Sequence, residues 1–329
     1  MKKRLTAIFL VMIMLLSCVA CGKQEPAEET VDQKESATAV SNGTLSDDSV
    51  VIAVGKTQVT YNEFKIYYNV MKDQYEETLT DALWSYQTDT AQKTVGQEAI
   101  EDVVRMIIQV KVIAKAAAAD GTVLEADEKE EADHNAQTIC EGMDEDTMKQ
   151  KGITQALLTQ VFEENKLAQK MYNVVTGKVD VNVLADQAKA ARVQLIYLPY
   201  TDGNKETVRA TAENLSAQAK KLEGNFYKFA KENTQGTDDI ECLVGQMDTR
   251  TNLASAVLAL KQYETTGVVE ESDGFYIAYC VETSNKTINE EYKNDLIAER
   301  QVKAFQEAYS QWSENYGVRV SKSLLVDKL

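Results

Sequence analysis

The sequence contains only two prolines and one histidine among its 329 residues. Because proline interrupts helices, and because there are only 15 glycines, the composition predicts a mostly helical protein. The single histidine, His134, has Glu130 one helical turn before it, within a run of charged residues. A metal site would need a third ligand, which this pattern does not supply. We therefore expect no metal and no cofactor.

Cysteine is also scarce. Beyond Cys18 and Cys21 near the N-terminus, the chain has Cys140, Cys242 and Cys280. None of these three has CxxC or zinc-ligand spacing, and three thiols do not build a disulfide framework. The sequence leaves open a single disulfide between Cys242 and Cys280.

Basic residues are outnumbered, with 35 Lys and Arg against 52 Asp and Glu, which gives a formal net charge of -17. Loss of Lys2, Lys3 and Arg4 with a cleaved leader would make the charge -20. This surplus of negative charge argues against nucleic acid and against an anionic lipid surface as partners. It suits solubility beside a membrane, and the alternative is a mild attraction for basic client proteins.

The apolar run at residues 7–16 is too short to cross a bilayer, which takes about 20 residues. Together with the preceding basic residues it predicts a signal peptide over residues 1–20. The run ends in Leu-Ser-Cys-Val-Ala-Cys-Gly at residues 16–22, which resembles a bacterial lipobox. The resemblance implies lipidation of Cys21, with Cys18 as the alternative. Two acyl chains suffice for stable anchoring, so we expect an extracytoplasmic protein on the outer face of the bacterial cytoplasmic membrane.

Residues 21–49 are rich in Glu, Ser, Thr and Ala without apolar periodicity, and we expect a disordered tether there. A hairpin is predicted to begin at Val50, followed by a capping box of Thr60 and Glu63 that opens a helix to about Tyr86. Apolar periodicity predicts further helices at residues 97–119, 126–142 and 154–176. The apolar stripe of the last helix fits a bundle core or, alternatively, a peptide groove. The pattern of strand, Gly-x-x-Val and Thr-x-x-Glu-Phe resembles the N-terminal domain of SurA-like and PrsA-like extracytoplasmic foldases.

The pattern changes after residue 190. A strand at 193–198 and a helix at 205–222 precede a Gly-x-Phe-x-x-Phe-Ala motif at 224–230, and a Leu-Ala-Leu-Lys motif at 258–261 precedes two strands. The strands are predicted at Val268-Val269 and at residues 275–281, after the Asp273-Gly274 turn. This order resembles the parvulin family of peptidyl-prolyl isomerases, over residues 191–282. The resemblance implies a small α/β domain that rotates X-Pro peptide bonds, whose barrier is about 18–20 kcal/mol.

The parvulin resemblance also implies a site. Members usually carry one histidine on the first strand and one on the last, beside a cysteine or an aspartate. Here the first position falls on Gln194 or Leu195 and the second on Tyr276, and Tyr263 stands where glycine is usual. The catalytic candidates are Tyr276, Gln194, Asp239 and Cys242. The candidates for a proline pocket are Leu243, Met247 and Phe275.

A long helix is predicted at residues 287–316, followed by a terminal strand from Val318 to Leu325. The helix carries an aromatic stripe, which predicts that it returns to the N-terminal helices. The expected fold class is α+β: a mainly helical, discontinuous SurA-like chaperone domain with an inserted parvulin-like α/β domain. The expected division is a signal peptide (1–20), a tether (21–49), a helical domain (50–188), a parvulin-like domain (189–284) and a returning helix and strand (285–329).

The sequence thus predicts a membrane-anchored extracytoplasmic foldase or chaperone that binds unfolded or partly folded exported proteins. Since neither expected histidine is present, its parvulin-like domain is expected to be weakly active or inactive. One alternative is an active prolyl isomerase with a different set of polar groups. Another is a scaffold lipoprotein that binds one partner.

Overall fold

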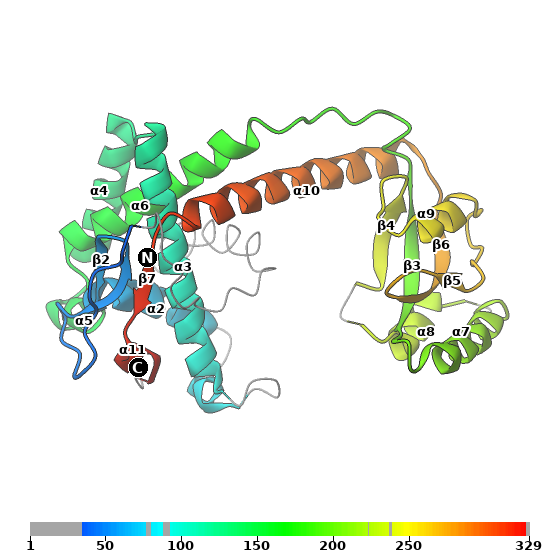
Figure 1. The fold of residues 1–329 in the computed structure, drawn as a ribbon, viewed down its shortest axis with the longest axis horizontal. Helices are drawn as coiled ribbons and strands as arrows, with labels where there is room; N and C mark the ends of the chain where they lie inside the picture. The colour runs from blue at the N-terminus through cyan, green and yellow to red at the C-terminus, as the bar shows by residue number, and fades with distance from the viewer. Residues whose placement is uncertain (1–34, 77–79, 88–92, 223, 237–238, 327–329) are drawn as a thin grey trace. The chain divides into compact units, whose positions relative to one another are not determined.

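The computed structural model describes residues 35–76, 80–87, 93–222, 224–236 and 239–326 (Figure 1). Two compact units make up the chain. The first consists of the described residues up to Val179 together with those from Gln301 onward, and the second is Asp180–Arg300. The lipidation candidates Cys21 and Cys18, with the signal peptide, lie outside the described residues.

The first unit contains a sheet built from both ends of the chain. Strands β1 (Val50–Val54) and β2 (Thr57–Thr60) form the predicted hairpin, and Gly55 has a φ of 55° at its turn. Strand β7 (Val318–Val320) pairs antiparallel with the other edge of β1, which gives the order β2-β1-β7. The predicted discontinuous α+β fold is therefore confirmed.

Helical elements follow the hairpin along the chain. They are α2 (Tyr61–Glu76), the 3-10 helix η1 (Asp81–Ser85), α3 (Val95–Asp120), α4 (Ala126–Glu141), α5 (Glu145–Gln150) and α6 (Gln155–Thr176). The hydroxyls of Thr94 and Thr154 accept hydrogen bonds from backbone amides in the first turns of α3 and α6. Gly121 ends α3 in a left-handed conformation. The prediction that the first helix continues to Tyr86 was wrong, because α2 ends at Glu76 and η1 is a separate turn.

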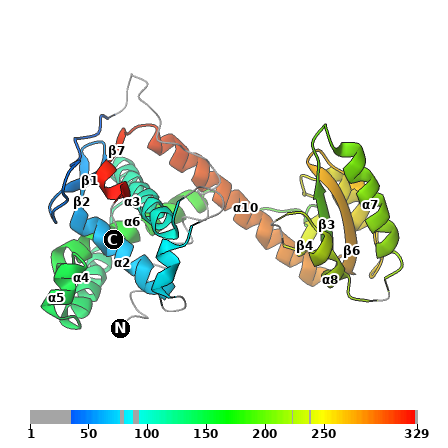
Figure 2. The ribbon, with the colours of Figure 1, turned by 90° about the horizontal axis from the view of Figure 1, so that it is seen from below.

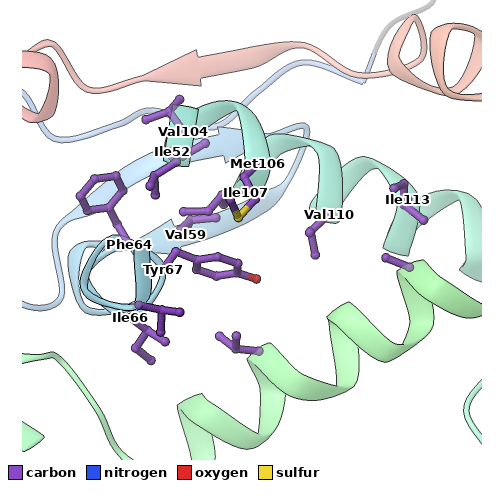
Figure 3. Packing of buried hydrophobic residues seen from close by; sticks show 14 of the residues in the cluster. Ile52, Val59, Phe64, Ile66, Tyr67, Val104, Met106, Ile107, Val110 and Ile113 are labelled. Carbon is purple, nitrogen blue, oxygen red and sulfur yellow. The ribbon is translucent and has the colours of Figure 1, made fainter. Parts of the chain in front are cut away.

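The core of the first unit lies where the hairpin meets α2, α3 and α6. Ile52 and Val59 from the strands, Phe64 and Tyr67 from α2, and Ile107 from α3 converge there, as Figure 3 shows. The stripe of α6 is buried in the same core through Leu158, Val161, Phe162 and Met171. The interpretation of this stripe as bundle core is confirmed, since little of it is left to form a groove.

A buried ion cluster lies beside this core. The side chain of Lys111 is 1% exposed, and its Nζ lies 2.6 Å from a carboxylate oxygen of Glu63 and 2.6 Å from one of Glu164. Burial by itself lowers the pKa of Lys111, but the two carboxylates raise it above its ordinary value. The predicted capping box is therefore only half formed. The Thr60 hydroxyl accepts the Glu63 amide at 3.3 Å, whereas the Glu63 carboxylate faces Lys111.

The segment predicted as a disordered tether is ordered from Glu35 onward. The Thr38 amide donates to the Gly55 carbonyl at 3.0 Å, and the Ser41 amide donates to the Val50 carbonyl at 2.8 Å. Glu35 forms a parallel bridge with Tyr316. Because these contacts are made by the backbone, the polar side chains of the segment gave no sign of them. The prediction of disorder was wrong for residues 35–49.

The second unit is a four-stranded antiparallel sheet in the order β4-β3-β6-β5. Its elements are β3 (Ala190–Pro199), α7 (Lys205–Ala219), α8 (Phe226–Asn233), β4 (Glu241–Gly245), α9 (Thr251–Leu258), β5 (Val269–Glu270) and β6 (Gly274–Glu282). Helices α7 and α8 pack on one face of the sheet, as Figure 2 shows for α7, and α9 packs on the other. The two faces therefore have separate cores.

Helix α10 (Lys286–Ser313) contributes to the cores of both units. Tyr292 and Leu296 pack with Val183 and Ile288 in the second unit, whereas Phe305 and Tyr309 are buried in the first. In the part of the chain that the structure describes, no helix has the length and apolar character to cross a membrane.

The terminal strand is shorter than predicted. It ends at Val320, and α11 (Lys322–Val326) follows where the prediction continued the strand to Leu325. The reason is Ser321, whose hydroxyl accepts the Leu324 amide at 3.4 Å and donates to the Ser41 carbonyl at 2.5 Å. A serine in this position starts a helix rather than extending a strand.

Candidate functional site

Tyr276 lies on β6, where successive side chains point to opposite faces of the sheet. Tyr276, Ala278 and Cys280 face α9, whereas Phe275 and Ile277 face α7 and α8. The Tyr276 side chain is almost fully buried, since the residue is 2% exposed. The residue on which the catalytic prediction depends is thus part of the core beneath α9.

The neighbour of Tyr276 on β3 is another tyrosine. Strand pairing places Tyr197 directly opposite Tyr276, and the two rings stack with centroids 4.8 Å apart. Both hydroxyls bind one residue of the turn before β6: Tyr276 donates to the Asp273 carboxylate at 2.7 Å, and Tyr197 donates to the Asp273 carbonyl at 3.0 Å. We call Tyr197 and Tyr276 the tyrosine pair, and Asp273 holds both of its hydroxyls.

An arginine covers this pair. Arg250, just before α9, forms a two-point ion pair with Asp248, with bonds of 2.9 and 2.7 Å. Its guanidinium lies 5.4 Å from the centre of the Tyr276 ring, within the range of a cation–π contact. The bonds to Asp248 raise the pKa of Arg250 further above its already high value. The guanidinium therefore keeps its charge and its position.

The same surroundings fix the protonation of Tyr276. Burial raises the pKa of the Tyr276 hydroxyl, and the hydrogen bond to Asp273 raises it further. At neutral pH the group is a phenol whose proton is held by a carboxylate. It can donate a hydrogen bond, but it cannot act as a base.

Substitution of Tyr276 by Phe is expected to reduce the loss of stability at alkaline pH. An unfolded tyrosine loses its proton near pH 10, whereas folded Tyr276 retains it. The folded state then binds more protons, so the free energy of unfolding falls as the pH rises above 10. The variant lacks this titration. For each pH unit above 10, its free energy of unfolding should therefore fall by up to about 1.4 kcal/mol less than that of the wild type. Denaturant melts between pH 8 and 12 measure this, and parallel curves for the two proteins would contradict it.

The remaining catalytic candidates do not form one site with the tyrosine pair. Gln194 belongs to the opposite face of the sheet by strand alternation, and its amide donates to Glu241 at 2.9 Å. Asp239 is exposed in the loop before β4. Cys242 is half-buried on β4 and packs against the cluster that contains Tyr276.

Cys242 and Cys280 do not form a disulfide. Each is the register partner of Val193, one from β4 and the other from β6, so a whole strand separates them. Neighbouring strands lie about 4.8 Å apart, which puts the two Cα atoms beyond the roughly 7 Å that a disulfide allows. Neither cysteine is part of a disulfide.

The residues predicted to line a proline pocket lie in three different surroundings. Phe275 is fully buried on the α7 face, with Tyr200 at 4.9 Å between ring centres and the Arg209 guanidinium at 4.8 Å. Leu243 packs against the cluster of Tyr292, and Met247 is 44% exposed in the turn after β4. The structure therefore does not bring Leu243, Met247 and Phe275 together as one pocket.

Two cavities of the second unit lie away from Tyr276. The larger, of about 470 Å³, is lined by residues from the end of α7, the start of α8 and the segment around Tyr263. The smaller, of about 390 Å³, is a shallow hollow beside Tyr200 and Glu270. Neither is lined by Tyr276, Gln194 or Cys242. Among the described residues no group of His, Cys, Asp and Glu could hold a metal ion, and His134 is exposed on α4.

The sequence reasoning missed Tyr197, Asp273, Arg250 and Asp248. The alternation of β3 could have placed Tyr197 on the face of Leu195, but the register opposite Tyr276 cannot be read from one strand. The Asp-x-Arg spacing at residues 248–250 was a usable signal for a local ion pair. Its contact with Tyr276 depends on the position of α9.

Comparison with known proteins gives similarity to solved structures only. No family model and no curated protein matches the chain. A PpiC-type peptidyl-prolyl cis-trans isomerase domain is 24% identical over 30% of this chain and 94% of that one, with a TM-score of 0.27. The peptidylprolyl isomerase PrsA of Bacillus anthracis is 17% identical over 63% of this chain and 95% of its own, with a TM-score of 0.35.

A SurA-like chaperone structure from Campylobacter jejuni is 11% identical over 83% of this chain and 99% of its own, with a TM-score of 0.29. The chain is thus similar to PrsA foldases, SurA-like chaperones and PpiC-type domains, the same groups that its sequence motifs resemble. With TM-scores this low, the likeness carries no argument about what the site does. That argument rests on the contacts described above.

Proposed function

We propose that this protein is a membrane-anchored extracytoplasmic chaperone or foldase that binds unfolded exported polypeptides without a cofactor. The observation that carries the proposal is a set of aromatic residues on the first unit, Tyr75 at the end of α2, Trp84 in η1 and Tyr86 directly after η1, which we call the aromatic cluster. Tyr75 is 49% exposed and Tyr86 is 65% exposed, and the rings of Tyr75 and Trp84 meet edge to face at 5.9 Å. Exposed aromatic groups on a helical surface fit apolar segments of unfolded chains.

The proposal includes weak or absent isomerase activity in the second unit. Isomerisation needs a pocket for the proline ring and a polar group free to stabilise the twisted amide. At the position corresponding to the family's second histidine, the Tyr276 ring is stacked on Tyr197 and its proton is held by Asp273. The Tyr276 hydroxyl is therefore not free to stabilise a twisted amide, which supports weak or absent activity.

Anchoring through Cys21, or through Cys18, is part of the proposal and rests on the lipobox resemblance alone. The described chain begins at Glu35, whose carboxylate pairs with Lys115 at 2.9 Å. The chain is thus fixed to the first unit within about 15 residues of Cys21. At about 3.5 Å per residue, an extended connection from Cys21 to Glu35 spans at most about 50 Å.

Two assays side by side test the proposal. The protein should suppress the aggregation of several unrelated unfolded proteins, and the double substitution Tyr75→Ser with Tyr86→Ser should weaken this several-fold, since it removes exposed aromatic surface. Val123→Ser is the matched control, because Val123 is 61% exposed on the same unit but lies outside the aromatic cluster. In the second assay, isomerisation of a short X-Pro peptide should remain at the uncatalysed rate.

Two outcomes would favour the alternatives. Isomerisation above the uncatalysed rate, abolished by Tyr276→Ala, would identify an active isomerase. Failure to suppress aggregation of any tested client would favour a scaffold protein with one partner. Equal suppression by the wild type and the double variant would exclude the aromatic cluster as the client-binding surface.

A further inference from the structure

The larger cavity of the second unit lies on the α7 and α8 face, opposite the tyrosine pair. Its volume is about 470 Å³, within the range of ligand-binding pockets. Its lining comes from four places in the sequence: the end of α7, the start of α8, the segment before β5, and β6. The residues that matter most are Leu222, Phe226, Tyr263, Thr265 and Tyr279.

Tyr263 stands at this cavity in a strained conformation. Its φ is 71°, and among the described residues it is the only non-glycine residue in the left-handed region that favours glycine. Its amide is held in place by a hydrogen bond to the Cys280 carbonyl of 2.7 Å. A glycine would adopt this backbone without strain, yet the chain has a tyrosine that is 66% exposed. An exposed ring adds little to a core, so strain retained here suggests a use for the ring.

The cavity offers aromatic surfaces. Tyr279 stacks on Phe226 with centroids 5.0 Å apart and an angle of 11°, and the Tyr263 ring is tilted against Tyr279 with centroids 6.4 Å apart. Leu222, also on the lining, is 40% exposed. These faces suit a flat apolar side chain, because aromatic rings gain from stacked and edge contacts beyond their area alone.

The charges on the lining balance. Among the described lining residues, Lys220 and Glu264 carry charge and have opposite signs, and the Glu264 carboxylate already accepts the Lys261 amide at 3.0 Å. These two charges together favour neither a cation nor an anion. A neutral ring fits the cavity better than a charged side chain.

A backbone edge runs past the cavity at Thr265. The Cys280 amide donates to the Glu264 carbonyl at 2.9 Å, and the Thr266 amide donates to the Ala278 carbonyl at 2.8 Å. In this antiparallel pattern the amide and carbonyl of Thr265, which lies between the two bonds, point away from β6. Such an edge is a template for one further extended strand.

We propose that this cavity binds an aromatic side chain of an extended polypeptide whose backbone pairs with Thr265. The proposal deepens the proposed function and rests on it for the source of the peptide, which is an unfolded client. The contact lies entirely within the second unit. It is therefore separate from the aromatic cluster and can be tested without it.

The test compares two variants of the full chain. The probe is a fluorescent, uncharged peptide with one central tryptophan, and a peptide with alanine in that position is the control. The wild type should bind the tryptophan peptide about tenfold more tightly than the alanine peptide, the scale expected for one stacked ring. Tyr263→Gly should abolish this preference, and it should also raise the Tm because it relieves the strained backbone. Tyr263→Phe should keep both the preference and the wild-type Tm.

Tyr263→Gly separates binding from folding, because a variant with a higher Tm has not lost its fold. Equal binding of the two peptides by the wild type, or an unchanged preference in Tyr263→Gly, would overturn the proposal. A lower Tm for Tyr263→Gly would also overturn it, since the strain argument would then be wrong. Peptide binding without suppression of aggregation would reject the chaperone function while supporting the cavity, and the reverse result would reject the cavity alone.

Discussion

Replacing Lys111 with Met is expected to lower the free energy of unfolding of the first unit by about 3–5 kcal/mol, the usual cost of breaking a buried ion pair. The substitution retains the length of the side chain and removes its charge. The carboxylates of Glu63 and Glu164, whose side chains are 3% and 18% exposed, would then face each other without a cation. Urea denaturation followed by circular dichroism measures the loss.

An exposed ion pair in the same unit provides the control. Lys166 pairs with Glu131, whose side chain is 63% exposed, so Lys166→Met should cost less than about 1 kcal/mol. Adding Glu63→Gln to Lys111→Met should recover part of the loss, because it removes one of the two unpaired charges. If Lys111→Met proves as mild as Lys166→Met, the buried cluster contributes little to stability.

Substitution of Phe305 by Ala is expected to destabilise the first unit by about 3–5 kcal/mol, as is usual when a buried Phe is truncated. Phe305 is fully buried, although it lies far along the sequence from the other core residues of that unit. Its ring meets Tyr172 at 5.1 Å and Trp312 at 6.0 Å, both edge to face. Removal of the ring would leave a cavity between α6 and α10.

The control for this substitution lies on the same helix. Lys303 is exposed, and Lys303→Ala should change stability by less than about 0.5 kcal/mol. Hydrogen exchange would locate the effect of Phe305→Ala, and the protection of α3 and α6 should fall. A loss of protection confined to Asp180–Arg300 would contradict the assignment of Phe305 to the core of the first unit.

Local signals in the sequence predicted much of the fold. The hairpin at Val50, the helices predicted at residues 97–119 and 154–176, and the long C-terminal helix all depend on residues close together in the chain. The ordered segment after Glu35 could not be found in this way, because backbone hydrogen bonds to distant residues hold it. The same holds for the helix after Ser321, which also depends on a contact with Ser41.

The candidate site was harder to predict than the fold. Motif resemblance placed the first polar position at Gln194 or Leu195, whereas strand pairing sets Tyr197 opposite Tyr276. Leu195 and Tyr197 are two residues apart and therefore lie on the same face of β3. Only the register of β3 against β6 decides which of the two lies opposite Tyr276. The parvulin resemblance placed Phe275 and Tyr276 in one site, but adjacent residues of a strand point to opposite faces.

The pairing of β1 with β7 has a consequence for biosynthesis. A ribosome makes β1 before, and β7 after, the whole of Asp180–Arg300. Domains generally fold as they emerge, so the inserted unit can fold while one edge of β1 still lacks its partner. Synthesis of the first unit therefore begins before that of the second unit and ends after it. A nascent chain that stops before Val318 would expose the edge of β1 to strand pairing with other chains.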